Sequence, residues 1–93
     1  MMKIKSTSRF KHAYNKLPRE FKNLFMDKMH QFQEDWRYPS FRVKRVQGTD
    51  NIWEGSLNMS MRFTFEWVKD EQDHEICLMR NIGDHDYCLR PPY

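Results

Sequence analysis

A histidine, a tyrosine and an arginine in the second half of this 93-residue chain have the chemistry needed to act on a phosphodiester. His85 and Tyr87 follow an expected strand, and Arg62 lies on the strand before it. Histidine titrates near neutrality, so His85 is suited to exchange protons with a ribose 2′-hydroxyl or a leaving 5′-oxygen. Tyr87 could donate a hydrogen bond to the phosphate, and the planar guanidinium of Arg62 could bind it.

Each of these residues also has a less specific interpretation. His85 could be a loop histidine that pairs with an adjacent aspartate, which in the catalytic interpretation would fix the imidazole tautomer. Arg62 could be a surface arginine that pairs across the sheet with Glu54 or Glu66. The pattern of residues leaves both interpretations open.

Charge is distributed unevenly along the chain. Residues 1–45 contain twelve Lys and Arg against four Asp and Glu, whereas residues 46–93 contain four against nine. A basic segment suits a polyanionic partner, because Lys and Arg that contact phosphates release bound counterions. The alternative is a solvated helix surface.

Three cations, Arg42, Lys44 and Arg45, occur in the expected strand 41–46. Arg42 and Lys44 would share one face of such a strand, which could follow the backbone of a single-stranded nucleic acid. An edge strand whose charges prevent aggregation is the alternative.

Two His-x-x-Cys pairs, at His74 with Cys77 and at His85 with Cys88, superficially resemble a zinc site. Cys77 and His85 lie at opposite ends of an expected strand, however, which separates them by about 25 Å. The chain also lacks a Gly-rich phosphate loop and a nucleophilic Ser or Cys motif. We therefore expect neither a metal nor a cofactor.

The composition predicts one domain over residues 1–93, because folded units are rarely much smaller. No apolar run approaches the roughly 18 residues of a membrane span, and the first residues lack the apolar region of a signal peptide. We expect a cytoplasmic protein without a membrane association, in which Cys77 and Cys88 are reduced thiols.

Hydrophobic spacing predicts the elements that must position these side chains. Helical spacing extends over residues 10–17 and 18–36, with Thr7 or Ser8 as the first cap and Pro18 in the first turn of the second helix. After Pro39 the period changes to two. The expected strands are 41–46, 52–57, 61–68 and 75–82, together with a weak strand at 2–6.

These elements predict an α+β fold, in which two N-terminal helices pack on one face of a four- to five-stranded, mainly antiparallel sheet. Within the strand 61–68, residues 61–67 alternate between apolar odd positions and polar even positions. If its apolar side faces the helices, Arg62 projects from the opposite face, which we expect to be uncovered.

Order and spacing together resemble the RelE/ParE superfamily of bacterial type II toxin–antitoxin toxins, over about residues 10–91. After two helices come Pro39-Ser40-Phe41-Arg42-Val43-Lys44, Gln47-Gly48-Thr49, Ile52-Trp53-Glu54, Arg62-Phe63-Thr64-Phe65 and Leu78-Met79-Arg80-Asn81-Ile82-Gly83-Asp84-His85-Asp86. The last segment is similar to the branch of the family that ends in Gly-x-His-Asp.

The resemblance implies a toxin that cuts messenger RNA in the ribosomal A site, with a cognate antitoxin as its inhibitor. It places Lys44 and Arg45 in the strand that holds substrate, Arg62 at the phosphate, and His85 and Tyr87 at positions for proton transfer or stacking. Arg42 and Arg80, in the matching segments, join the nucleic-acid-binding candidates.

One departure concerns the general base. Many nucleases of this family carry a further basic residue in the strand that here reads Glu54-Gly55-Ser56-Leu57. Glu54 or His85 could serve instead, or the protein could be an inactive relative. The resemblance also permits a gyrase inhibitor or a nucleic-acid-binding protein without catalysis.

Overall fold

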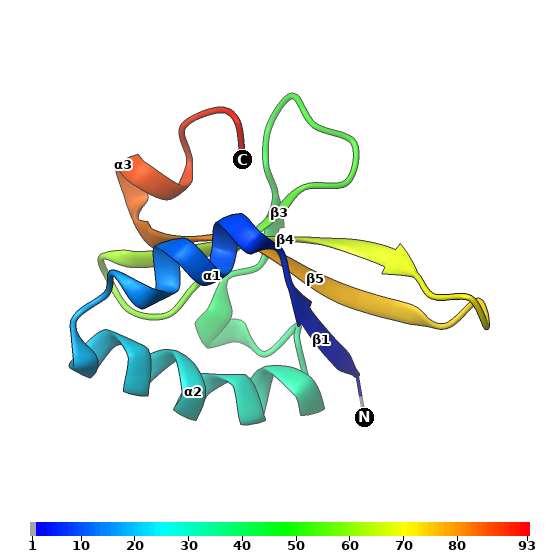
Figure 1. Cartoon of the computed structure of the whole chain (residues 1–93), viewed down its shortest axis with the longest axis horizontal. Coiled ribbons are helices and arrows are strands. Elements are labelled where there is room, and N and C mark those ends of the chain that lie inside the picture. Colours follow the sequence, from blue (N-terminus) through cyan, green and yellow to red (C-terminus); the bar gives the residue numbers. More distant parts are fainter. Residues whose placement is uncertain (1) are drawn as a thin grey trace.

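Two helices and a sheet form the two layers of the molecule (Figure 1). The computed structural model describes residues 2–93. In chain order the elements are β1 (Lys3–Ser6), α1 (Ser8–Asn15), α2 (Arg19–Glu34), the 3₁₀-helix η1 (Pro39–Phe41), β2 (Lys44–Arg45), β3 (Trp53–Ser56), β4 (Met61–Lys69), β5 (Glu75–Asp84) and α3 (His85–Cys88).

The sheet has the strand order β1-β5-β4-β3-β2. β2, β3, β4 and β5 pair antiparallel with their neighbours, and β1 pairs parallel with β5. The first strand therefore lies at one edge, and the chain reaches the other edge before it returns by three antiparallel steps. The predicted fold class, including a mainly antiparallel sheet of five strands, is confirmed.

The two long helices begin where the sequence signals predicted. The Thr7 side chain accepts a hydrogen bond from the Phe10 main-chain nitrogen at 3.0 Å and so caps α1. Pro18 immediately precedes α2, where its missing N–H costs no helical hydrogen bond. In α2 the buried residues are Phe25, Met29 and Phe32, whose spacing of four and three places them on the side that meets the sheet.

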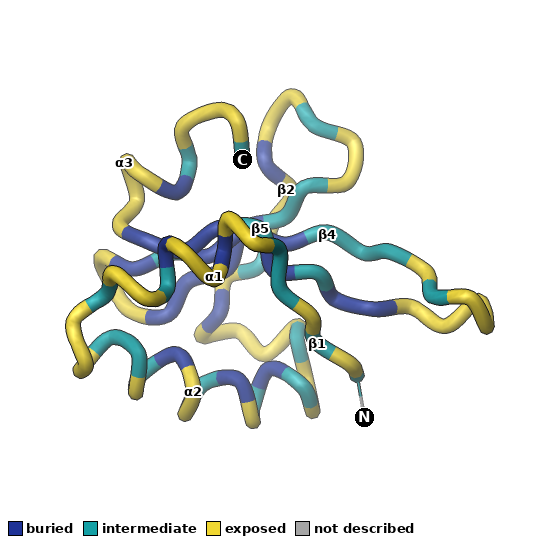
Figure 2. Tube along the Cα trace, viewed as in Figure 1, coloured by how far each residue is buried: buried dark blue, intermediate teal, exposed yellow. Residues whose placement is uncertain are grey.

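An aromatic cluster joins the helices to the sheet. The ring centroid of Phe32 lies 5.3 Å from that of Phe63 and 5.5 Å from that of Phe65, and both contacts are edge-to-face. Phe63 also contacts the Phe25 ring. Gly55 makes room for this ring, because a Cβ at that position would lie 2.4 Å from Phe63 Cζ. Figure 2 shows the buried residues concentrated in the sheet and on the inner sides of both helices.

The prediction of a strand over residues 41–46 is wrong for the first half of that segment. Phe41 ends η1, and Arg42 has a φ of 47°, in the left-handed region that a strand does not use. Only Lys44 and Arg45 pair with β3. The physical reason is local: Pro39 favours a tight turn, and the turn buries the Phe41 ring against Phe32. Arg42 and Lys44 therefore do not share a strand face.

The C-terminal segment also differs from the prediction. β5 continues to Asp84, and α3 follows directly, capped by the Asp84 carboxylate, which accepts from the Tyr87 main-chain nitrogen at 2.8 Å. Gly83 belongs to the strand and not to a turn. α3 and the chain after it lie on the side of the sheet opposite α1 and α2 (Figure 1). Within residues 2–93 no helix is long and apolar enough to cross a membrane.

Candidate active site on the polar face of the sheet

The face of the sheet opposite α1 and α2 has a buried polar floor. Thr64 on β4 pairs with Glu54 on β3 and with Asn81 on β5, and directly paired residues share a face. Ser56 lies two residues after Glu54 and so projects to the same side. These four are the buried polar residues of the described chain. We call this side, defined by Glu54, Ser56, Thr64 and Asn81, the polar face.

The sequence led us to expect that the polar face is uncovered. This expectation is wrong, because α3 covers it. Cys88 of α3 is fully buried, and α3 contacts both β4 and β5. Burial raises the pKa of the Cys88 thiol to about 12. Thr64 Oγ1 and both side-chain polar atoms of Asn81 have no hydrogen-bond partner among residues 2–93. A polar floor is thus sealed beneath a short helix.

Next to α3 the cover leaves a hollow of about 520 Å³. We call it the basic hollow. It brings together four candidates from the sequence, since its lining residues are Lys44, Arg45, Val46, Gln47, Glu54, His85, Leu89 and Tyr93. The candidates come from three elements: β2 supplies both cations, β3 supplies the carboxylate, and the imidazole stands at the first position of α3.

Lys44 and Glu54 form an ion pair at the floor of the basic hollow. The Lys44 Nζ atom lies 3.3 Å from Glu54 Oε1, and the two side chains are 72% and 10% exposed, respectively. The carboxylate is therefore almost buried, while the ammonium group remains available to a ligand. Because the Lys44 end of the pair is open to solvent, the pair itself contributes little stability.

His85 stands at the rim of the basic hollow and is mostly exposed. Its Nδ1 atom lies 3.5 Å from Asp86 Oδ1, so the adjacent aspartate near the imidazole is Asp86, while Asp84 caps the helix. The His85 main-chain nitrogen donates to the Ser60 carbonyl oxygen at 3.1 Å. The main chain at His85, and with it the start of α3, is thus tied to the turn between β3 and β4.

Arg62 and Tyr87 lie outside the basic hollow. Both are at the end of the sheet where β4 begins and β5 ends. Arg62 Nη1 donates to the carbonyl oxygens of Asn58 and Met61, at 2.7 and 3.0 Å. It therefore shares the β3–β4 turn with His85 and forms no ion pair with Glu54 or Glu66.

The Tyr87 ring covers Gly83, the residue paired with Arg62, since a Cβ on Gly83 would lie 2.5 Å from Tyr87 Cδ2. Tyr87 also borders a separate hollow beside α1. Its position follows from the missing side chain of Gly83, and its hydroxyl group does not line the basic hollow.

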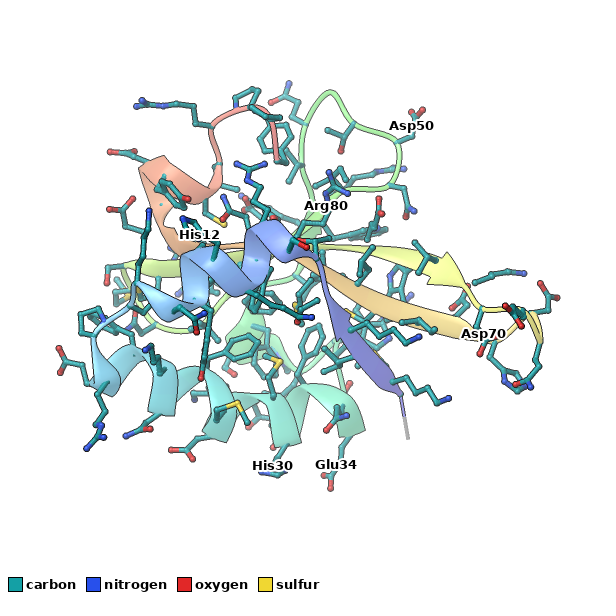
Figure 3. All side chains as sticks on the ribbon, viewed as in Figure 1. His12, His30, Glu34, Asp50, Asp70 and Arg80 are labelled. Atoms are coloured by element: carbon teal, nitrogen blue, oxygen red, sulfur yellow. The ribbon has the colours of Figure 1, made fainter. Side chains whose placement is uncertain are left out.

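The remaining two arginines of the sequence prediction are placed elsewhere. Arg80 forms an ion pair with Glu66 at 3.3 Å and donates from Nε and Nη2 to the main-chain oxygen of Tyr93, at 3.1 and 3.0 Å. Figure 3 shows Arg80 on the sheet near the end of the chain. It anchors the C-terminal segment across the polar face. Arg42 lines other hollows.

Sequence reasoning missed Tyr93, Gln47 and Leu89 as parts of the hollow. Tyr93 and Leu89 enter it only because the chain folds back after β5, and no periodicity signals such a return. The polar floor left a signal in the sequence, since Thr64 is one of the polar even positions of β4 and Asn81 follows Arg80 in β5. Across residues 2–93 no three His, Cys, Asp or Glu side chains gather as a metal site would require.

Comparison with models of known protein families finds no match, and comparison with curated proteins finds none either. Solved structures do match. A YoeB/ParE toxin from Agrobacterium tumefaciens superposes with a TM-score of 0.70 at 11% identity, covering 90% of this chain and 99% of that one. The chain has the RelE/ParE toxin fold.

Two further structures with this toxin fold come from complexes. A chain of the E. coli DinJ–YafQ toxin–antitoxin complex gives a TM-score of 0.72 at 8% identity, with 96% of this chain and 98% of that chain covered. A chain of the archaeal RelE–RelB complex from Pyrococcus horikoshii OT3 gives 0.66 at 14% identity, with 89% and 93% covered. At these identities the likeness concerns the RelE/ParE fold and not its residues.

Proposed function

We propose that this protein is the toxin of a type II toxin–antitoxin system, in the RelE/ParE superfamily, and that it cuts messenger RNA on the ribosome. The observation that carries the proposal is the basic hollow, in which Lys44, Glu54 and His85 meet on the polar face of a RelE/ParE fold, with Arg45 next to them on the edge strand. Cations, a carboxylate and an imidazole are the groups that metal-independent phosphodiester cleavage needs.

In the proposed reaction the ribose 2′-hydroxyl attacks the adjacent phosphorus atom. The 2′-oxygen loses its proton to a general base, the bond between phosphorus and the 5′-oxygen breaks, and the 5′-oxygen takes up a proton. The products are a 2′,3′-cyclic phosphate and a free 5′-hydroxyl. The exposed Lys44 ammonium would stabilise the charge that develops on the phosphate, typically the largest catalytic contribution. The Arg45 guanidinium, which lies 5.8 Å from the Trp53 ring, would contact the adjoining part of the strand.

His85 is the proton-transfer group of this proposal, because it is the titratable side chain at the exposed rim of the hollow. Glu54 is the second candidate for the base. Its carboxylate lines the hollow and lies 3.3 Å from the Lys44 ammonium group. Arg62 acts from the β3–β4 turn that it shares with His85, and Tyr87 is a stacking residue beside Gly83.

The other proposed partners follow from the same site. The basic hollow is shallow and lies at the surface, so a large assembly such as the ribosome would have to position the RNA. The DinJ–YafQ and RelE–RelB structures are toxin–antitoxin complexes, which supports a cognate antitoxin as the inhibitor here. A cytoplasmic location would follow from these partners. The proposed toxin would consist of one domain over residues 1–93.

The first experiment induces the protein in a bacterial host without an antitoxin and compares the wild type with His85→Gln. We expect the wild type to stop protein synthesis and to create new mRNA 5′ ends, and the variant to do neither. His30→Gln is the matched control, because His30 is an exposed histidine on α2, on the other side of the sheet (Figure 3).

The same induction distinguishes a gyrase inhibitor, the second function compatible with the fold. Gyrase inhibition would change plasmid supercoiling without new mRNA 5′ ends, and it would not depend on His85, because binding a protein requires no proton transfer. Supercoiling changes in both the wild type and His85→Gln, with translation unaffected, would contradict the nuclease proposal.

A further inference from the structure

A second hollow, of about 390 Å³, lies between the end of α2 and β3. We call it the aromatic hollow. Its lining combines rings with guanidinium groups and consists of Trp36, Arg37, Tyr38, Pro39, Arg42, Val43 and Trp53. In Figure 3 Glu34 marks the end of α2 from which this lining starts. None of the residues to which the proposed reaction assigns a role lines it.

The rings of the aromatic hollow are already in contact with cations. The Arg37 guanidinium carbon lies 4.7 Å from the centroid of the Trp36 ring, and the Trp36 and Trp53 centroids are 6.2 Å apart. Nucleobases stack both on aromatic rings and on guanidinium planes, so this lining offers two kinds of stacking surface.

The two arginines of the aromatic hollow have no acidic partner among residues 2–93. Arg37 and Arg42 are exposed and form no ion pair there. The nearby Asp35 carboxylate instead accepts from the main-chain nitrogen of Arg37 at 3.2 Å. Two unpaired guanidinium groups beside two tryptophans in edge-to-face contact match the phosphates and bases of a single strand.

Arg45 connects the aromatic hollow to the basic hollow. It lines the basic hollow, yet its guanidinium carbon lies 5.8 Å from the ring centroid of Trp53, which lines the aromatic hollow. Arg45 and Trp53 are paired residues of β2 and β3. β2 is the edge strand, so a single strand could pass over this edge from one hollow to the other.

We propose that the aromatic hollow binds unpaired nucleobases of the RNA strand that flanks the bond in the basic hollow. Trp53 and Trp36 stack with the bases, and Arg37 and Arg42 contact the phosphates. The inference rests on the proposed function for the identity of the strand. It adds a site that gives a modest preference among the nucleotides beside the cleaved bond, since bases differ in stacking strength.

The test measures binding in the absence of ribosomes, by fluorescence anisotropy of fluorescein-labelled single-stranded oligoribonucleotides on the order of ten nucleotides long. The probes are oligoadenylate and oligouridylate. We expect Trp53→Leu to bind oligoadenylate about 10-fold more weakly than the wild type, and Trp53→Phe to retain most of the affinity.

Tyr14→Leu is the matched aromatic control. Tyr14 lines a hollow of about 330 Å³ between α1 and α2 that is of similar size but contains no arginine, and we expect its substitution to leave RNA affinity unchanged. Thermal unfolding of both leucine variants separates lost binding from lost structure.

Arg37→Gln and Arg42→Gln test the phosphate contacts. Both positions are exposed, so we expect the substitutions to leave folding intact. Each should reduce the slope of log affinity against log salt concentration by about 0.7, the value for one phosphate contact on a single strand. The control is Arg19→Gln, which removes the same charge at the opposite end of α2. A slope that falls equally for Arg19→Gln would contradict specific contacts.

Other outcomes are equally decisive. Equal affinity of the wild type and Trp53→Leu for both probes, or no binding by the wild type, would overturn the proposal. So would Trp53-dependent binding of an oligoglutamate peptide with no change in RNA affinity, since that would assign the hollow to an acidic protein partner. If Trp53-dependent RNA binding appears but the protein cleaves no messenger RNA on ribosomes, the site stands and the proposed nuclease function fails.

Discussion

The two faces of the sheet are both buried, but they are built from opposite kinds of residue. On the side of α1 and α2 the sheet presents Phe63 and Phe65, which contact other rings. On the polar face, Thr64 and Asn81 are equally inaccessible yet have no hydrogen-bond partner in the described chain. The first arrangement contributes stability, whereas the second costs stability, and such costs are typical of functional sites.

The two faces also differ in how easily the elements that cover them can open. The aromatic side is held by two helices, one of them 16 residues long. The polar face is covered by a helix of 4 residues and by a segment fixed through the contacts of Arg80 with Tyr93. Local opening therefore requires less free energy on the polar face, which is the side that carries the proposed active site.

The largest effect is expected on the aromatic face. Phe63→Ala removes a fully buried ring that contacts Phe25, Phe32 and Phe65. We expect the free energy of unfolding to fall by about 3–5 kcal/mol, measured by denaturant titration. A loss below about 1 kcal/mol would show that the two faces do not differ in stability in the way described.

The two buried thiols report how completely water is excluded from each face. Burial raises the pKa of Cys77, in the aromatic core, and of Cys88, beneath α3, from 9.0 to about 12. Because the folded state holds each proton more tightly than the unfolded state, both contributions are fully present below pH 9 and are lost as the pH rises towards 12.

We therefore expect the free energy of unfolding to fall above pH 9 by up to about 1.4 kcal/mol per pH unit for each thiol. Urea titrations at pH 8, 9 and 10 of the wild type, Cys77→Ala and Cys88→Ala measure it, and each substitution should remove about half of the slope. A full slope in Cys88→Ala would mean that water reaches the thiol beneath α3.

A smaller effect with the opposite sign is expected at the polar floor. Asn81→Leu replaces a buried amide without partners by an apolar side chain of similar size. We expect a gain of about 1 kcal/mol in the free energy of unfolding, because the cost of the unpaired amide disappears. Asn81→Asp is the control, since it retains the shape and buries a charge. A loss of more than about 1 kcal/mol in Asn81→Leu would show that the floor is satisfied by ordered water.

The smallest effect concerns the ion pair that borders the basic hollow. Lys44→Gln should lower the free energy of unfolding by less than about 1 kcal/mol, because the Lys44 end of the pair is open to solvent. The double variant with Glu54→Gln should recover the loss. A non-additive recovery would be evidence for the contact, and strictly additive losses would exclude it as a stabilising interaction.

The sequence predicted the aromatic face well and the polar face in part, for a physical reason. Spacings of three, four and two residues report which side of an element is apolar, and they correctly placed Phe63, Phe65 and the inner residues of α2. What covers the polar face depends on a return of the chain after β5, which is a long-range contact. No local pattern indicated that Tyr93 would reach Arg80.

The candidate site shows the same limit. His85 after the last long strand and the cations of β2 were correctly located along the chain, since they lie in or next to regular elements. Arg42 was misplaced, because the burial of Phe41 in a 3₁₀ turn outweighed the strand pattern of residues 41–46. Glu54 was a candidate on weak grounds, and its burial beside Lys44 now gives the carboxylate a defined partner.

The proposal that the basic hollow is a nuclease site is tested by cleavage of messenger RNA by purified protein on purified ribosomes. The comparison is among the wild type, His85→Gln and His30→Gln. We predict 2′,3′-cyclic phosphate products, a rate about 10²–10⁴-fold lower for His85→Gln, and an unchanged rate for His30→Gln. If His85→Gln cleaves as fast as the wild type, His85 is not the proton-transfer group. If the wild type cleaves no RNA on ribosomes, the basic hollow is not a nuclease site.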